Sequence, residues 1–522
     1  MAEAARQAES DAIKAGMADD GIGLANGGTG AKAYGEAIGV YLALLVDKLA
    51  DYNSSICSWH AGRDLVRNTF GRQAIPMVWD YAEANPFCSS SGSFGNMLEW
   101  IVKALQNAPC GKQGQACQAN AQTGQNLANL LISTDPPYYD NIGYADLSDY
   151  FYIWLRRSLG DIYPDIFATM LVPKAEELVA TPHRFEGSKD RAREFFESGM
   201  LATFHRLADM ASEDYPVSVY YAFKQQDTKE GTSSGWETML SGLIEAGFCI
   251  TGTWPMRTEL TNRPVATGTN ALASSIVLVG RKRPRGATAT SRRNFLKELS
   301  QALPQALTAM QVGNIAPVDM AQAAIGPGMA VFSRYSQVLE ADGRPISVGH
   351  ALQAINAELD SYFSARDMAL DPASRFCLDL YTQNAFEPIT FGQADVLARA
   401  KNTSVETLAN AGMLSAGKGI VRLLGREEMP ESPSPCLWQF VQYLGQALAT
   451  GGHKACAKLM NQWPEHSSPA RELCYRLYSL AERKHWSEEA QVWNNLVTAW
   501  PEMEAAAMAA KSGMEQGWME EF

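Results

Sequence analysis

The chain has 522 residues and a mass of 57.0 kDa, a length that predicts about three or four domains. Hydrophobic residues make up 46% and charged residues 19%, so the composition excludes a largely disordered protein. No apolar run approaches the ~20 residues that a membrane span needs. The amino terminus, Met-Ala-Glu-Ala-Ala-Arg, lacks the basic start and apolar core of a signal peptide. The sequence therefore predicts a cytoplasmic protein with no membrane partner.

The cysteines, the histidines and the net charge limit which disulfides, metal sites and DNA-binding surfaces the chain can have. Nine cysteines are sparse and odd in number, which argues against a disulfide framework. The gap between Cys110 and Cys117 is not zinc-ribbon spacing, and the seven histidines show no ligand spacing, so we expect no metal site. A net charge of −13 gives no sign of a basic DNA-binding face. One local cluster could contact DNA phosphates, or could be an ordinary charged exit from a strand: Arg281, Lys282, Arg283, Arg285, Arg292 and Arg293.

Residues 1–127 are predicted to be a helical segment. Apolar residues between 38 and 52 recur with a 3.6-residue period, and helical patterns continue through Trp79 and through residues 98–102. Residues 111–127 are rich in Gln, Asn and Gly, which predicts a surface loop. The glycine-dense segment 27–30 could start a helix or hold a cofactor. It follows a polar, helix-like stretch rather than an apolar strand, which favours the helix start and leaves the cofactor-binding residues unknown.

Residues 128–285 alternate between strand and helix patterns. Short apolar runs predict strands at 130–134, 217–223, 248–254 and 275–279. Helices are predicted at 147–159, 191–211 and 236–244 between them. This succession predicts an α/β sheet covered by helices.

The remainder is predicted to be mostly helical, in two parts. Within residues 294–429, the stretch 390–424 gives helix, turn, helix and a short strand, which suits either a winged helix or a plain helical bundle. Residues 436–522 form a helical tail that carries tryptophans at helical spacing. We expect those tryptophans to be core residues.

One motif indicates chemistry: Asp135-Pro136-Pro137-Tyr138 follows the apolar strand 130–134, where an open α/β sheet presents its ligands. The carboxylate of Asp135 and the carbonyl of Pro136 could each accept a hydrogen bond from an exocyclic amine and so free its lone pair for attack on a methyl group. Pro137 would hold the backbone rigid, and the Tyr138 ring would stack on a flipped base. The structural alternative is a proline-stiffened turn with a capping aspartate.

Other residues are candidates to contact the substrate. Tyr139, Asp140 and Tyr144 continue the run after the motif and could line its pocket. Arg257 and Asn270 fall in a predicted hairpin near the end of the sheet, together with Asn262 and Arg263. They could contact the target strand or could be ordinary polar loop residues.

Residues 133–156, which contain the motif, resemble the amino-methyltransferase signature of a group of bacterial and archaeal DNA methylases. These enzymes carry a DUF1156 domain and are described as adenine-specific methylases with a zinc ribbon. Residues 326–331 resemble a stretch beyond the family's catalytic domain. Four further stretches match later strands of the family in the same order: 220–225, 235–238, 254–257 and 270–277. The resemblance covers most of residues 20–365.

The resemblance implies an incomplete class I (Rossmann-like) methyltransferase sheet, with a helical N-terminal extension and a mostly α-helical C-terminal region. It implies S-adenosyl-L-methionine as cofactor, DNA as substrate, N6-adenine as the methylated position, and a restriction-modification or phage-defence system. The family's DUF1156 segment, its Phe-x-Gly-x-Gly cofactor loop and its zinc ribbon have no counterpart in this sequence. We therefore expect the C-terminal half of a larger or split enzyme, with a partner chain that supplies the cofactor-binding half.

Two other functions fit the same residues. The chain could be a non-catalytic DNA-binding or scaffolding subunit with a degenerate methyltransferase fold. Alternatively, the amine acceptor could belong to RNA or to a protein glutamine amide, because related motifs act on those substrates.

Overall fold

The computed structural model describes residues 1–71, 74–75, 77–108, 114–124, 127–137, 139, 143–221, 234–257, 274–366 and 370–512. The chain divides into two compact units. Unit 1 comprises Met1–Gln125 and Pro137–Thr203, and unit 2 comprises Asn126–Pro136 and Phe204–Phe522. Helix α5 (Lys189–Met210) contributes residues to both.

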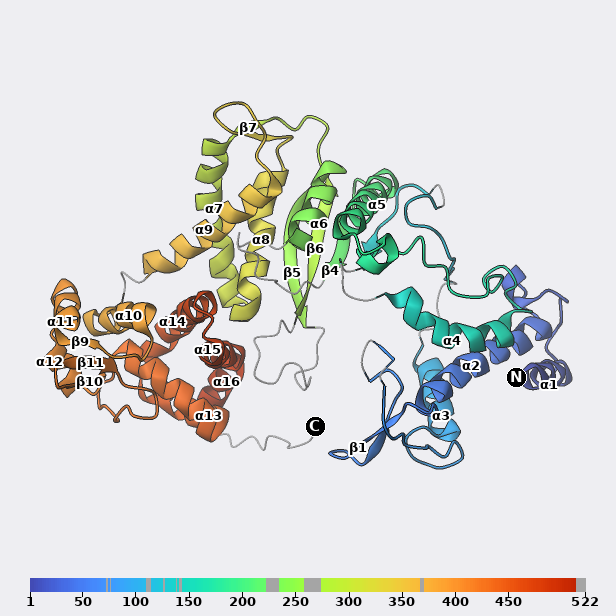
Figure 1. The fold of residues 1–522 in the computed structure, drawn as a ribbon, viewed down its shortest axis with the longest axis horizontal. Coiled ribbons are helices and arrows are strands. Elements are labelled where there is room, and N and C mark those ends of the chain that lie inside the picture. Colours follow the sequence, from blue (N-terminus) through green and yellow to red (C-terminus); the bar gives the residue numbers. More distant parts are fainter. Residues whose placement is uncertain are drawn as a thin grey trace. The chain divides into compact units, whose positions relative to one another are not determined.

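Unit 1 is built around helix α2 (Ala31–Tyr52), on which three other helices pack (Figure 1). These are α1 (Ala2–Lys14), α3 (Phe94–Asn107) and α4 (Tyr144–Leu159). Two short 3-10 helices complete its helical part, η1 (Leu24–Asn26) and η2 (Pro182–Phe185). The helices predicted at 38–52, 98–102 and 147–159 are therefore confirmed.

The prediction of helix through Trp79 is wrong. Residues 58–67 form an antiparallel hairpin of β1 (Ser58–His60) and β2 (Leu65–Arg67), and the chain around Trp79 has no regular structure. The hairpin turns at Asp64, whose φ of 48° lies in the left-handed region that aspartate tolerates. A turn residue in this conformation brings two short segments together as a hairpin. The spacing of the apolar residues, which predicted a helix, does not reveal such a turn.

Unit 2 contains a four-stranded sheet with the strand order β3-β4-β6-β5. Its strands are β3 (Ser133–Thr134), β4 (Val217–Tyr221), β5 (Phe248–Arg257) and β6 (Ser274–Lys282). Strands β3 and β4 are parallel, whereas β6 runs antiparallel to both of its neighbours. The chain is thus a mostly helical α/β protein, and the four strands predicted in 128–285 are present.

A Rossmann-like sheet is not evident among the described strands. A sheet of that kind consists mostly of parallel strands joined by crossover helices. In this sheet β3 and β4 are the one described pair that is parallel, whereas β6 is antiparallel to both β4 and β5. What the described residues contain is a small mixed sheet.

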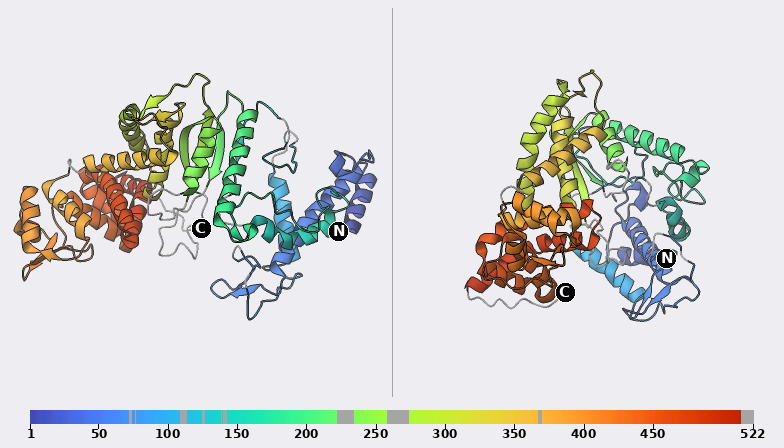
Figure 2. Two further views of the ribbon diagram at one scale, coloured as in Figure 1. Left: turned by 45° about the horizontal axis from the view of Figure 1, so that its top comes forward. Right: turned by 60° about the vertical axis from the view of Figure 1, so that its left-hand side comes forward.

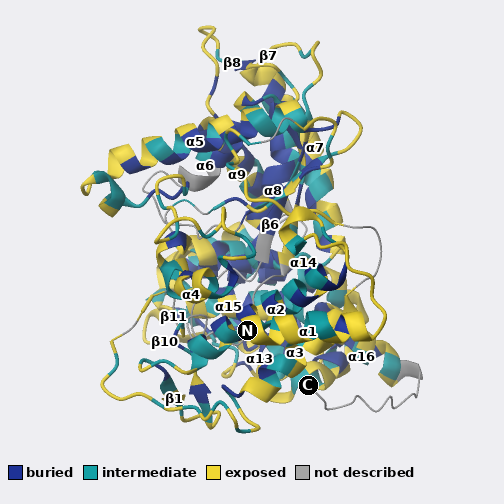
Figure 3. Cartoon of the chain, turned by 90° about the vertical axis from the view of Figure 1, so that its right-hand side faces the viewer, coloured by how far each residue is buried: buried dark blue, intermediate teal, exposed yellow. Residues whose placement is uncertain are grey.

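Helices that precede and follow β5 in the sequence cover this sheet. Helix α6 (Ser234–Glu245) and helix α8 (Pro317–Ser333) both pack on β5. Most residues of α8 are buried, and the helix appears dark blue in Figure 3. Helices α7 (Arg292–Val312) and α9 (Val348–Arg366) pack on α8, and β7 (Thr290–Ser291) pairs in parallel with β8 (Val338–Leu339).

Residues 372–423 form a helix, a turn between two further helices, and a hairpin. The elements are α10 (Pro372–Asn384), β9 (Ile389–Thr390), α11 (Phe391–Ala400), α12 (Val405–Asn410), β10 (Leu414–Gly417) and β11 (Ile420–Leu423). The three strands form one antiparallel sheet in the order β10-β11-β9. The β10–β11 turn has positive φ at both Lys418 and Gly419, as a two-residue hairpin turn requires.

The chain continues in a helical bundle, drawn in orange and red in Figures 1 and 2. Its members are α13 (Leu437–Gln462), α14 (Pro464–Arg483), α15 (Ser487–Thr498) and α16 (Trp500–Ser512). Of the tail's predicted core tryptophans, Trp438, Trp493 and Trp500 are fully buried, whereas Trp463 and Trp486 are only half-buried. In the described residues, no helix is both long and apolar enough to cross a membrane.

Candidate functional site

Asp135 and Pro136 of unit 2 follow directly after β3, at its carboxyl end. The Asp135 side chain is exposed, whereas Pro136 is buried. Among the described residues the Asp135 carboxylate has no hydrogen-bond or ion-pair partner, and partial desolvation raises its pKa above the usual value. Within the described residues, the carboxylate is thus an exposed hydrogen-bond acceptor at the end of a strand.

The backbone that leads to this position is held by parallel pairing. The amide of Leu130 donates to the carbonyl of Met210 (2.9 Å), and the carbonyl of Leu130 accepts from the amide of Ser212 (2.8 Å). Further along, the carbonyl of Ile132 accepts from the amide of Ser218 (3.0 Å). These bonds fix β3 beside β4 and thereby fix where Asp135 leaves the sheet.

The next residues of the motif belong to unit 1. Tyr139 is half-buried: its carbonyl accepts from the amide of Ala180 (2.7 Å), and its ring meets Phe196 edge-on at 5.1 Å. Tyr144 opens helix α4 with 53% of its surface exposed, so its ring is available to a ligand. Tyr138 and Asp140 lie outside the described residues, and their predicted roles stay predictions.

An ion-pair cluster that the sequence analysis did not single out braces the start of α4. Arg184 contacts the carboxylates of Asp146 and Glu177, each at 2.8 Å. Burial alone would lower the pKa of Arg184, but the two carboxylates outweigh it and the pKa is raised. Glu177 also accepts from the amide of Ala145 in the first turn of α4 (3.0 Å). Because 38 residues separate Arg184 from Asp146, no local pattern could have revealed the cluster.

The glycine segment 27–30 does not fit a site for S-adenosyl-L-methionine. Its amides are bonded within the chain: Gly27 donates to the carbonyl of Leu24 and Gly28 to the carbonyl of Gly23 (both 3.1 Å), and Thr29 donates to the Asp20 carboxylate (3.0 Å). Gly30 is the N-cap of α2, so the segment starts a helix. Because the amides of Gly27, Gly28 and Thr29 are already bonded within the chain, they are not available to a bound cofactor.

The predicted hairpin contacts cannot be placed. Strands β5 and β6 do form the expected pair, with Arg257 opposite Ser274 at its end. The Arg257 side chain and residues Asn262, Arg263 and Asn270 lie outside the described parts of the structure.

Three of the six residues of the basic cluster at the end of the sheet contact other parts of the chain. Arg281 donates to the carbonyl of Asp214 (3.0 Å), and Arg292 pairs with Glu340 (3.5 Å). Arg283 donates to the carbonyls of Ser333 (3.0 Å) and Ile244 (2.7 Å). These contacts favour a structural role for the cluster, in which it holds the chain in place where it leaves β6.

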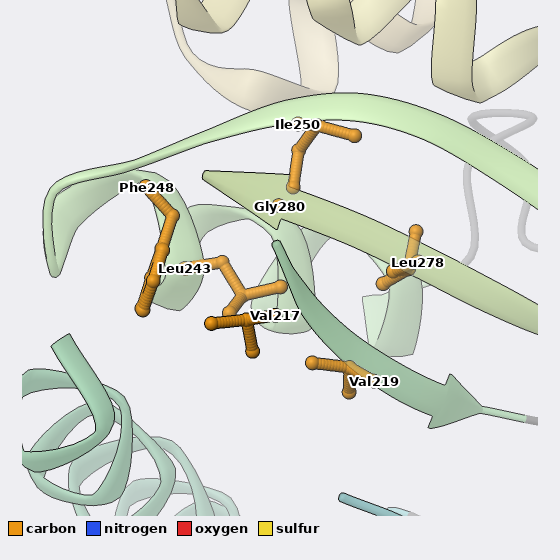
Figure 4. A pocket seen from close by; sticks show the side chains of 7 residues that line it. All are labelled: Val217, Val219, Leu243, Phe248, Ile250, Leu278 and Gly280. Atoms are coloured by element: carbon orange, nitrogen blue, oxygen red, sulfur yellow. The ribbon is translucent and has the colours of Figure 1, made fainter. Parts of the chain in front are cut away.

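Behind the sheet lies a small apolar gap that has no room for a water molecule (Figure 4). It is lined by Val217, Val219, Leu243, Phe248, Ile250, Leu278 and Gly280. With Leu243 coming from α6 and the others from β4, β5 and β6, the gap belongs to the hydrophobic core and is not a ligand site. Over the described part of the chain, no group of three or more His, Cys, Asp or Glu residues could hold a metal ion.

Comparison with known proteins identifies one similarity. Residues 371–519, which span α10 to α16, match a domain of unknown function, DUF8807. No curated protein and no solved structure matches the chain at the significance level applied.

Proposed function

We propose that the chain is the base-binding half of an S-adenosyl-L-methionine-dependent amino-methyltransferase that acts on DNA, with the N6 amine of adenine as its target. The observation that carries this proposal is the exposed carboxylate of Asp135, next to Pro136, at the carboxyl end of a strand that is paired in parallel. Ligands of α/β sheets bind at that edge. The adenine target and the setting in restriction-modification or phage defence rest on the family resemblance.

The topology of the sheet supports the same proposal. A class I methyltransferase sheet ends in a hairpin whose last strand runs antiparallel and is inserted beside the preceding parallel strand. In this chain β6 is antiparallel and lies between β4 and β5. The order β3-β4-β6-β5 thus suits the carboxyl-terminal half of such a sheet, and β3 carries the motif at its end.

The chain's own residues would bind and orient the amine. The Asp135 carboxylate would accept one N–H of the exocyclic amine, and the Pro136 carbonyl would accept the other. Two acceptors placed in this way favour a lone pair directed out of the ring plane, and the carboxylate stabilises positive charge that develops on the nitrogen. Neither Pro136 nor Pro137 has an N–H that could compete for these acceptors. We assign no described residue to hold the methyl donor, because the glycine segment does not fit it.

A non-catalytic DNA-binding or scaffolding role is the second candidate. The paired amides of the glycine segment favour it, as does the helix-turn-helix with a hairpin in residues 389–423. That unit is poorly suited to phosphate contact, because Arg399, Lys401 and Arg422 are ion-paired to Asp395, Asp379 and Glu428. A protein-binding role would fit such a surface better than DNA reading.

The test is methyl incorporation by the complex that the tagged chain forms in its own cells, assayed on duplex DNA, RNA and protein with labelled S-adenosyl-L-methionine. We expect incorporation into DNA, and Asp135→Ala should lower it at least about 100-fold, since it removes a group that stabilises the transition state. Asp165→Ala is the matched control, because Asp165 is an exposed aspartate outside the motif. Undiminished incorporation by Asp135→Ala would refute the proposed role, and labelling of RNA or protein alone would change the substrate.

A further inference from the structure

Three sulfur atoms from distant parts of the chain meet in unit 2. The Cys377 thiol donates a hydrogen bond to the thioether of Met413, with Sγ and Sδ 3.8 Å apart. The Cys436 thiol donates to the same Sδ atom at 3.4 Å. The two cysteines are 36 and 23 residues from Met413 along the chain, so the spacing of cysteines and histidines in the sequence does not reveal this set.

The fold holds each of these side chains in place. Cys377 lies within α10, and Cys436 is the N-cap of α13. The amide of Met413 donates to the carbonyl of Leu408 (3.0 Å), and its carbonyl accepts from the amide of Leu424 (2.9 Å). Cys377 and Met413 are buried, whereas Cys436 is half-buried, so the set can be reached from solvent on the side of Cys436.

The surroundings of the two thiols keep them protonated when no cation is bound. Burial raises the pKa of Cys377 well above its usual value, and Cys436 and Asp371 add to that rise. Burial also raises the pKa of Cys436, although the backbone amide of Gln439 opposes the rise. This amide lies in the first turn of α13, where the helix dipole favours a negative charge. A thiolate at Cys436 would therefore gain support from the helix, and a bound cation would offset the cost of burying both thiolates.

The spacing of the sulfurs suits a single small cation. A first-row metal bonds to thiolate sulfur at about 2.3 Å, so three sulfurs in a plane around one ion lie about 4.0 Å apart. The separations of 3.8 and 3.4 Å fall short of this value by about 0.2 and 0.6 Å, so small side-chain shifts would admit the ion. Two thiolates and a thioether select Cu(I), whereas zinc takes four ligands. We propose that Cys377, Met413 and Cys436 bind one Cu(I) ion.

Binding changes the oxidation state of neither the copper nor the sulfurs. Two S–H bonds break and their protons pass to solvent, while two thiolate–copper bonds and one thioether–copper bond form. The three ligands and the ion then carry one net negative charge, next to the first turn of α13. All three residues lie within the stretch that matches DUF8807 and outside residues 128–285. The copper site is therefore independent of the proposed methyl transfer.

Two substitutions remove a ligand while keeping the local structure. Met413→Leu keeps a buried apolar side chain of similar volume and both thiols but removes the thioether. Cys436→Ser removes a thiol and leaves a residue that is preferred at the N-cap of a helix. Met200→Leu, at a buried methionine of α5 in unit 1, is the matched control. Circular dichroism and urea unfolding of the metal-free variants check that each one folds.

The experiment titrates the metal-free full chain with Cu(I) without oxygen, in competition with bicinchoninate, a chelator that suppresses weak binding by other thiols. We expect the chain to hold one Cu(I) ion and to melt at a higher temperature when loaded. The affinity should fall at least about tenfold with Met413→Leu and with Cys436→Ser, and change less than about twofold with Met200→Leu. X-ray absorption should show three sulfur neighbours of copper in the native chain and two in Met413→Leu.

Three results would overturn the proposal. The native chain could lose all of its Cu(I) to the chelator. Met413→Leu and Cys436→Ser could both keep the native affinity. The number of sulfur neighbours could stay the same when the thioether of Met413 is removed.

Discussion

Asp135 and Asp47 are two aspartates with raised pKa values in different settings. Asp135 is exposed at the end of β3 and has no partner in the described structure, so it can accept a ligand's hydrogen bonds. Asp47 lies in the buried part of α2 with 9% of its surface exposed, and its Oδ1 atom has no hydrogen-bond partner among the described residues. Burial raises the pKa of Asp47 to about 7.

Asp47 makes the stability of unit 1 depend on pH. The unfolded chain ionises this group near its ordinary pKa of 3.8, whereas the folded chain keeps its proton until about pH 7. The folded state therefore binds the extra proton between these values, and its stability falls as pH rises through this window. Above about pH 7 the loss is complete.

Asp47→Asn should remove this pH dependence. We expect the variant to be more stable than the native chain by about 1–3 kcal/mol at pH 8, with the difference shrinking toward pH 4. The measurement is urea unfolding across that pH range, with Asp165→Asn as the exposed control. A variant that keeps the native slope against pH would show that Asp47 is not the group responsible.

At the scale of elements, the contact between β5 and α8 explains how Gly326 and Pro327 are accommodated inside a helix. Pro327 has no N–H to bond the carbonyl of Ala323 four residues earlier. The Thr253 hydroxyl donates to that carbonyl (2.7 Å) and accepts from the amide of Gly326 (3.2 Å). A Cβ atom at Gly326 would lie 2.3 Å from the Thr253 amide nitrogen, so only glycine fits.

Thr253→Val should therefore destabilise unit 2. The change keeps the shape of the side chain but removes the hydroxyl that donates to the buried Ala323 carbonyl and accepts from the Gly326 amide, at a cost of about 1–3 kcal/mol. Thr251→Val in the same strand is the control, because Thr251 is exposed and should change the free energy of unfolding by less than about 0.5 kcal/mol. Equal urea midpoints for the two variants would contradict this account of the contact.

Local patterns predicted most of the elements but not how they assemble. The apolar runs predicted β4, β5 and β6, and the 3.6-residue periods predicted α2, α4 and α5. The hairpin at 58–67 was missed because a left-handed Asp64 creates it. The motif at Asp135 could be found because its four residues are contiguous in the sequence. The ion pairs of Arg184 could not be found, because they join residues far apart along the chain.

At the scale of the whole molecule, the motif is divided between the two units. Asp135 and Pro136 belong to unit 2, and Pro137 to unit 1. The DUF8807 match covers only residues 371–519 of unit 2, beyond the sheet that carries Asp135. The proposed activity therefore depends on residues 128–285, and residues 371–512 are a helical region whose buried tryptophans indicate a structural core.

The most direct test of a base-binding half is calorimetric titration of S-adenosyl-L-methionine into the chain alone and into the complex that the tagged chain forms in its own cells. The paired amides of the glycine segment predict no measurable heat for the chain alone. The complex is expected to bind the cofactor. Tight binding by the chain alone, or no binding by either sample, would contradict the division of the site between two polypeptides.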